Sequence, residues 1–207
     1  KANYKILFCL FFLFSCSQNK YKLTIKEPEN SITIKDEYFV YLDSKGWELI
    51  KNYNFFRCEK KKFNINIHNI YDHEVNKLLN NIFSNLKFDD FKNSDEKHNK
   101  LFFKISQNKA FANFNYDGDK LEFNLVLNGE ISFFNGNEEV FHSKIKAEGS
   151  AIRRSLIFCN PKQVALIAVE NAMTKYLDLV SKNILKAIEI HGKNDIYICK
   201  GVCYEKN

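Results

Sequence analysis

The sequence predicts an α+β fold, with an antiparallel sheet of long strands and two helices packed on one face of the sheet. Residues 120–134 and 141–147 alternate apolar and polar side chains, which is the two-residue period of a strand. Residues 73–86 and 161–191 repeat apolar side chains at intervals of three and four, the period of a helix with one buried stripe. Helices in such folds gather on one side of an antiparallel sheet.

Length and composition fit one globular domain. The chain has 207 residues, of which 45% are hydrophobic and 27% charged, which is usage typical of a folded chain. Phe (20) and Tyr (10) are frequent while Pro (2) and Gly (7) are scarce, as expected from an AT-rich genome. The net charge of +6 comes from lysines spread along the chain, so it predicts only mild attraction to anionic surfaces. The one basic run, Lys60 to Lys62, is expected in a solvated loop.

The N-terminal segment has the pattern of an export signal. Lys1 and Lys5 form a positive n-region, and residues 6–14 form an apolar h-region of about nine residues. This run is too short for a membrane-spanning helix, which needs about 20 residues. A plain cleaved signal peptide and a buried apolar strand are two possible interpretations of this segment.

Residues 13–16, Leu-Phe-Ser-Cys, resemble the lipobox of bacterial lipoproteins. The resemblance implies that Cys16 carries the lipid as the first residue of the mature chain. The expected organisation is a signal peptide over residues 1–15, a tether over 16–30 and a single α+β domain over 31–207.

Four cysteines remain for the folded domain, and they are candidates for disulfides: Cys58, Cys159, Cys199 and Cys203. An even number in an exported protein predicts up to two disulfides, with three possible connectivities. Buried free thiols, or a metal or redox site, are the alternatives. Cys199 and Cys203 have a C-x3-C spacing, whereas metal and redox sites usually use C-x2-C.

The first part of the chain predicts strands at residues 32–34 and 38–42, and the second is apolar on both faces and therefore expected in the centre of the sheet. Residues 47–62 have no readable pattern. Residues 63–68 alternate as a half-buried strand. Asp72 is the expected N-cap of the first helix. The buried stripe of that helix is Val75, Leu78, Leu79, Ile82, Phe83 and Leu86.

Three long antiparallel strands follow a charged loop over residues 88–100. The first, over residues 101–116, is broken near Gln107 and Asn108. The second keeps its two-residue phase through Asn128-Gly129, which favours one long strand with a kink at Gly129 over a hairpin. A turn at residues 135–138 leads to the third, whose inner face carries Phe141, Ser143, Ile145 and Ala147.

The second helix is expected to begin at Asn160-Pro161, a capping residue followed by proline at the first helical position, and to end near His191. Its length of roughly 45 Å is enough to cross the sheet. Three alanines beside its apolar stripe would let the backbone lie close to the sheet: Ala165, Ala168 and Ala172. A last strand over residues 195–204 carries Cys199 and Cys203.

This arrangement resembles the small envelope lipoproteins of Gram-negative bacteria, namely the YajG-like proteins, the lipopolysaccharide-assembly lipoprotein and the auxiliary lipoproteins of ABC-type lipid transporters. The likeness covers residues 32–190. It rests on Cys16, on the helix around residues 74–83, on the hairpin ending at residues 141–149, and on the alanine-spaced helix at 165–172. The resemblance implies a non-enzymatic part in envelope assembly or transport.

Enzyme motifs are missing from the sequence. His73-Glu74 begins like the zinc-protease motif H-E-x-x-H, but Lys77 stands where the second histidine ligand belongs. His68 and His142, expected on outer strand faces, have no metal-ligand spacing. Arg153-Arg154 is expected to be solvated. We therefore expect no catalytic residue, no metal and no cofactor.

The expected function is a non-catalytic binding or assembly role in the cell envelope. We expect the lipid on Cys16 to anchor the protein to the membrane. The expected partner is another envelope protein or a lipid. We do not expect nucleic-acid binding, because no strip of basic residues accompanies the aromatic residues. The expected location is the outer membrane, facing the periplasm or the surface. The alternatives are a surface-exposed lipoprotein that binds host molecules and a thiol-disulfide protein that uses Cys199 and Cys203.

Overall fold

The structure is a computed structural model. The residues that it describes are 23–26, 31–43, 48–55, 58–88, 100–117, 120–154, 161–191 and 196–199. The predicted signal peptide, Cys16, Cys159 and Cys203 lie outside the described residues. Cys58 and Cys199 lie on described strands, but their side chains lie outside the description.

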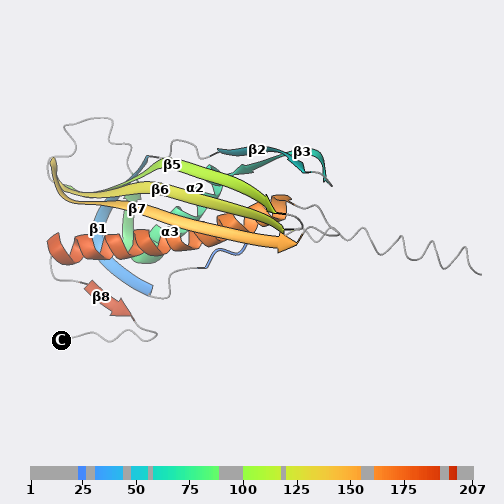
Figure 1. Cartoon of the computed structure of the whole chain (residues 1–207). Coiled ribbons are helices and arrows are strands. Elements are labelled where there is room, and N and C mark those ends of the chain that lie inside the picture. The colour runs from blue at the N-terminus through green and yellow to red at the C-terminus, as the bar shows by residue number, and fades with distance from the viewer. Residues whose placement is uncertain are drawn as a thin grey trace, which may run out of the picture.

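The described residues form one main sheet, a separate two-stranded sheet and two helices (Figure 1). The strand order in the main sheet is β4-β1-β5-β6-β7, and β8 pairs with β1. Its strands are β1 (Ser31–Asp43), β4 (Phe83–Phe88), β5 (Leu101–Asp117), β6 (Lys120–Asn135), β7 (Glu138–Arg154) and β8 (Ile196–Cys199). The helices are α2 (Ile67–Ile82) and α3 (Pro161–His191). The predicted α+β class, with a mostly antiparallel sheet and two helices, is confirmed at this level.

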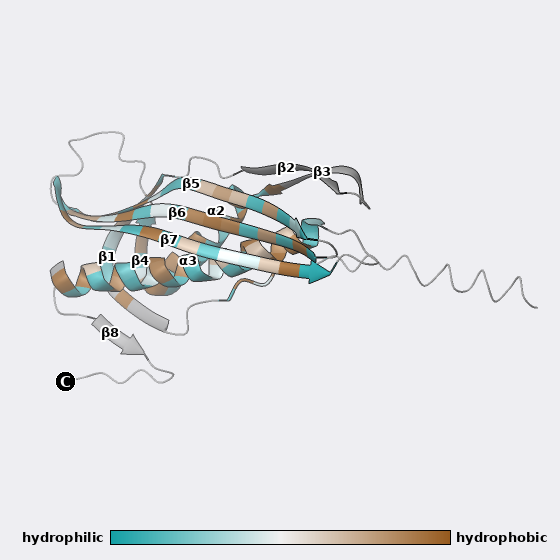
Figure 2. Ribbon diagram, viewed as in Figure 1, coloured by the Kyte–Doolittle hydropathy of each residue, from teal (hydrophilic) through white to brown (hydrophobic). Residues whose placement is uncertain are grey.

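The long antiparallel meander β5-β6-β7 is confirmed. β6 pairs along its whole length with both neighbours, so Asn128-Gly129 lies inside a strand and not in a hairpin. The turn between β6 and β7 contains Gly136, whose φ of 60° is readily adopted only by glycine. Figure 2 shows hydrophobic and hydrophilic residues alternating along these strands, as expected for a sheet with one buried face.

The predicted break in β5 is a β-bulge. Gln107 pairs with Gly129 and Lys109 with Asn128, which leaves Asn108 as the extra residue. An extra residue reverses the side-chain alternation of a strand. Phe103 and Ile105 therefore face the core before the bulge, and Ala110, Ala112, Phe114 and Tyr116 pack against the core after it.

β1 corrects the predicted sheet in two ways. It is one continuous strand and not two, and it runs parallel to both β4 and β5. Its central position is as expected from its apolar residues. Tyr38, only 1% exposed, is in ring contact with Phe83, Phe103 and Phe133, with centroids 5.1 to 6.2 Å apart.

The bounds of α2 differ from the prediction at both ends. The N-cap is Asn66, whose side chain accepts a hydrogen bond from the N–H of Asn69 (2.9 Å), so the prediction of Asp72 as the cap was wrong. The helix ends at Ile82, because Phe83 is extended and begins β4 beside β1. His68 consequently lies in the first turn of α2, not on a strand.

Residues 47–62, unreadable in the sequence, contribute most of a hairpin. β2 (Glu48–Phe55) and β3 (Cys58–Asn66) pair with each other in an antiparallel two-stranded sheet, separate from the main sheet. Lys60 to Lys62 are therefore strand residues and not part of a loop. The hairpin leaves the domain after β1 and returns at the start of α2.

α3 spans the predicted range and packs mainly on β6 and β7. Ala165, Ala168 and Ala172 are fully buried. A Cβ atom on Gly149 of β7 would lie 2.1 Å from the carbonyl oxygen of Ala168 and 2.4 Å from the backbone nitrogen of Ala172. The expected close approach of helix and sheet is thus observed. α2 contacts α3 through Tyr71 and Tyr176, while the placement of both helices on one face stays a prediction.

Gly149→Ala should lower the free energy of unfolding by about 1–3 kcal/mol, because the added methyl group meets helix backbone that cannot rotate away. Chemical denaturation measures the change. The neighbouring Ser150→Ala, on an exposed side chain, is the control and should stay within about 0.5 kcal/mol of wild type. Equal stability of the two variants would contradict the packing described for α3 and β7.

Candidate functional site

Two regions of the described domain gather polar groups from distant parts of the sequence. One is the surface where residues 23–26 meet α3 and β7. The other, which we call the polar cluster, is made of His68, Tyr71, Asp72, Gln107 and Tyr176.

Residues 23–26 lie against α3, although they belong to the segment expected as a tether. The backbone N–H of Thr24 donates to Oε2 of Glu170 (3.2 Å), and that of Lys26 donates to Oγ1 of Thr174 (3.4 Å). Ile25 packs against the hydrophobic core. The chain is therefore held on the domain at residues 23–26, a segment that begins seven positions after Cys16.

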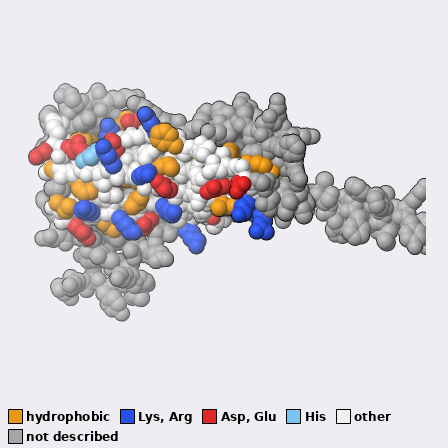
Figure 3. All heavy atoms as spheres, viewed as in Figure 1, with side chains coloured by type: hydrophobic (Ala, Val, Ile, Leu, Met, Phe, Trp, Pro, Cys, Tyr) orange, Lys and Arg blue, Asp and Glu red, His pale blue; other side chains and the backbone are white. Residues whose placement is uncertain are grey.

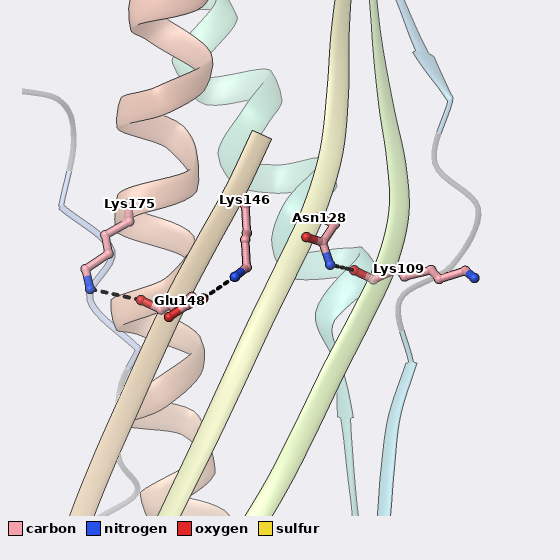
Figure 4. A network of polar contacts seen from close by, with 5 residues as sticks. All are labelled: Lys109, Asn128, Lys146, Glu148 and Lys175. Carbon is pink, nitrogen blue, oxygen red and sulfur yellow. Dashed lines mark hydrogen bonds and ion pairs between the residues drawn. The ribbon is translucent and has the colours of Figure 1, made fainter. Parts of the chain in front are cut away.

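Side chains of α3 also cover part of the outer edge of β7. Asn171 Nδ2 donates to the carbonyl of Ser150 and Lys175 Nζ to that of Glu148, both at 2.9 Å. Figure 4 shows Lys175 reaching β7 from α3, while Lys146 on the same strand pairs with the Glu148 carboxylate at 2.6 Å. This hydrogen bond and the positive charge of Lys146 lower the pKa of Glu148. Such contacts satisfy edge carbonyls that would otherwise be open to another strand.

A hollow of about 390 Å³ lies between these elements, lined by Lys26, Ser150, Glu170, Asn171, Thr174 and Lys175. The charged part of its lining consists of two lysines and one glutamate. Its side chains already fix residues 23–26 and the β7 edge. This hollow therefore lies where residues 23–26 bind to α3.

The polar cluster combines residues of α2, β5 and α3. Tyr71 and Tyr176 are fully buried, with ring centroids 5.8 Å apart in an edge-on arrangement. On α2, His68 Nε2 is 3.2 Å from Asp72 Oδ2, one helical turn along. Gln107, at the bulge in β5, is only 4% exposed and lies opposite Gly129, where the Tyr176 hydroxyl is located. Sequence analysis missed this cluster, although a glutamine at the break in β5 and a glycine within β6 were its local signals.

Burial changes the acidity of three tyrosines. It raises the pKa of Tyr38 to about 12, with the negative charge of Asp36 adding to the effect. Burial also raises the pKa of Tyr176. Burial raises the pKa of Tyr71 well above its usual value, and the nearby Tyr176, Asp72 and Asp43 raise the pKa of Tyr71 as well. All three tyrosines therefore stay protonated in the folded domain at alkaline pH values at which the unfolded chain begins to ionise them.

A serine, a histidine and a glutamate meet on the outer face of the sheet, but they do not form a catalytic relay. Nδ1 of His142 is 3.0 Å from both Ser132 Oγ and Glu139 Oε1. A catalytic triad needs the carboxylate on one ring nitrogen and the nucleophile on the other. Because both groups compete for one nitrogen, the arrangement ties β6 to β7 and does not activate Ser132.

The other polar residues singled out in the sequence are dispersed over the fold. Arg153 donates to Oε1 of Gln163 on α3 (2.8 Å), and His73 is exposed on α2. Within the described ranges, no group of three His, Cys, Asp or Glu side chains could hold a metal ion, and no helix is long and apolar enough to cross a membrane. Figure 3 shows charges of both signs mixed with hydrophobic side chains on the face in view.

No protein-family model and no curated protein matches the sequence. Among solved structures, a Xanthomonas campestris protein of family DUF330 has a similar fold, with a TM-score of 0.52, 8% identity, and coverage of 82% of this chain and 96% of that one. A Helicobacter pylori protein described as a homologue of a neuraminyllactose-binding hemagglutinin has a TM-score of 0.39, at 11% identity over 82% and 95% of the two chains. A minor lipoprotein from Acinetobacter baumannii has a TM-score of 0.32, at 10% identity over 79% and 96%. The first likeness shows the fold alone, and we draw nothing from the other two.

The double variant Glu170→Ala/Thr174→Val should release residues 23–26 from α3. Each lost hydrogen bond contributes roughly 0.5–1.5 kcal/mol, so the backbone amides of Thr24 and Lys26 should exchange with solvent about tenfold faster, as measured by hydrogen exchange. Lys182→Met on the same helix breaks the exposed pair with Asp178 and is the matched control. Unchanged exchange at Thr24 and Lys26 in the double variant would refute the docking of this segment.

The free energy of unfolding should fall as the pH rises above about 10. The unfolded chain then ionises Tyr38, Tyr71 and Tyr176 while the folded domain keeps them protonated, at a cost of about 1.4 kcal/mol per pH unit for each tyrosine. Urea denaturation at several pH values measures the slope. Tyr176→Phe should make the slope shallower by the share of one tyrosine. An equal slope in wild type and variant would show that Tyr176 ionises normally in the folded domain.

Proposed function

We propose that this chain is a lipid-anchored protein of the bacterial cell envelope whose α+β domain acts by binding, without catalysis. The observation that carries the proposal is the sequence of residues 1–16, a positive and then apolar segment that ends in a lipobox-like Leu-Phe-Ser-Cys. In this proposal Cys16 is the attachment site for the lipid, including a palmitoyl chain, and residues 1–15 are removed.

The docking of residues 23–26 supports an anchoring role for the segment before them. Leu23 is seven positions after Cys16, and at about 3.5 Å per position the chain between them spans at most about 25 Å. The surface formed by α3 and the edge of β7 would then be the part of the domain held nearest the bilayer. A domain held this close can meet only partners at or near the membrane.

The proposed location is the outer membrane, with the domain facing the periplasm or the cell surface, and the proposed partner is another envelope protein or a lipid. The resemblance to YajG-like, lipopolysaccharide-assembly and ABC-transport auxiliary lipoproteins, drawn from the sequence, supports an assembly or transport role. Export would also allow disulfides among Cys58, Cys159, Cys199 and Cys203.

Metabolic labelling with an alkyne analogue of palmitate tests the anchor. The wild-type protein should be labelled and recovered with membranes, whereas Cys16→Ala should lose the label entirely, because the thioether to the lipid cannot form. Cys58→Ala is the matched control and should be labelled like wild type. Equal labelling of Cys16→Ala and wild type would refute the lipid anchor.

A further inference from the structure

Gln107 is the most unusual polar residue of the described core. It is 4% exposed, and neither its amide oxygen nor its amide nitrogen has a hydrogen-bond partner in the described part of the chain. Two further buried atoms in the polar cluster share this condition, Nδ1 of His68 and Oδ1 of Asp72. Buried polar atoms in native proteins almost always have partners, supplied by ordered water where protein atoms do not reach.

The register of the sheet brings Gln107 to the tyrosine pair. Gln107 lies directly opposite Gly129, and a Cβ atom on Gly129 would be 2.1 Å from the hydroxyl of Tyr176. That hydroxyl therefore occupies the space that a side chain on β6 would fill beside Gln107. Tyr176 in turn contacts Tyr71, and the two hydroxyls interact.

The cluster continues from the tyrosine pair toward the surface. Tyr71 is three residues after His68 on α2, and residues three apart on a helix are neighbours. His68 in turn pairs with Asp72, four residues along, whose negative charge also acts on Tyr71. The side chains of His68 and Asp72 are 27% and 36% exposed, respectively. The cluster thus includes both the buried amide of Gln107 and a partly exposed pair on α2.

We propose that the polar cluster is an internal hydration site, in which ordered water bridges the amide of Gln107 to the tyrosine hydroxyls and to the His68–Asp72 pair. Water suits this site because the cluster offers both donors and acceptors: the glutamine amide provides each, a hydroxyl can act as either, and Asp72 Oδ1 accepts. A water molecule with two to four such partners satisfies atoms that the protein leaves unpaired.

The hydration site would lie where the β2–β3 hairpin leaves the domain. The hairpin follows Asp43, which pairs in register with Ser106 beside Gln107, and it returns into the first turn of α2. Bridging water would therefore lie close to both ends of the hairpin, at Asp43 and at the first turn of α2. This role is independent of the proposed lipid anchor.

A crystal structure of the wild-type protein, at a resolution that locates individual water molecules, tests the proposal directly. We expect at least one ordered water molecule within hydrogen-bond distance of Nε2 or Oε1 of Gln107. A structure in which both amide atoms contact only protein atoms would overturn the proposal.

Oxygen-17 magnetic relaxation dispersion, which counts long-lived internal water molecules, provides the test in solution. Gln107→Leu keeps the approximate size of the side chain and removes both amide atoms, so the count should fall by at least one. Tyr38→Phe, at another buried tyrosine outside the cluster, is the matched control and should keep the wild-type count. If Gln107→Leu does not fold, Tyr176→Phe replaces it with the same expectation. An unchanged count in a folded cluster variant would overturn the proposal.

Discussion

The contact between α3 and β7 at Gly149 is the constraint on which the rest of the domain depends. With no side chain at Gly149, the helix backbone at Ala168 and Ala172 comes close enough to exclude even a methyl group. One turn beyond Ala172, Tyr176 then reaches over Gly129, and Asn171 and Lys175 reach the carbonyls along the edge of β7. Glu170 and Thr174 on the same helix hold the N-terminal segment. The proximity of one helix to one strand thus positions both polar regions of the domain.

The bulge in β5 is the second constraint, and it explains why a glutamine lies in the core. Odd-numbered residues face the core before the bulge and even-numbered residues after it. Without the extra residue, Ala110, Ala112, Phe114 and Tyr116 would face solvent. Gln107 is the last inward-facing residue before the reversal. The side chain of Asn128 supports the bulge by donating to the carbonyl of Lys109 (3.3 Å), as Figure 4 shows.

These constraints divide the domain into a tightly packed body and two peripheral parts. The body is the main sheet with α2 and α3, whose core contains most of the buried apolar side chains. The peripheral parts are residues 23–26, held by exposed hydrogen bonds, and the β2–β3 hairpin, which forms its own small sheet. In the proposed envelope role, residues 23–26 connect the body to the lipid.

The sequence by itself determined the β5-β6-β7 meander, the long helix α3 and its alanine contact with the sheet, because each depends on a period that repeats over many adjacent residues. It also contains the lipobox-like segment around Cys16. Only the tertiary structure decided where α2 ends, since Phe83 and Leu86 continue the helical stripe and become strand residues through pairing with β1. Local sequence patterns likewise could not predict the parallel direction of β1, the β2–β3 hairpin or the polar cluster. The cluster joins Tyr71, Gln107 and Tyr176, which are far apart in the chain. It forms only where α2 contacts α3 and where Gly129 leaves room for Tyr176 opposite Gln107.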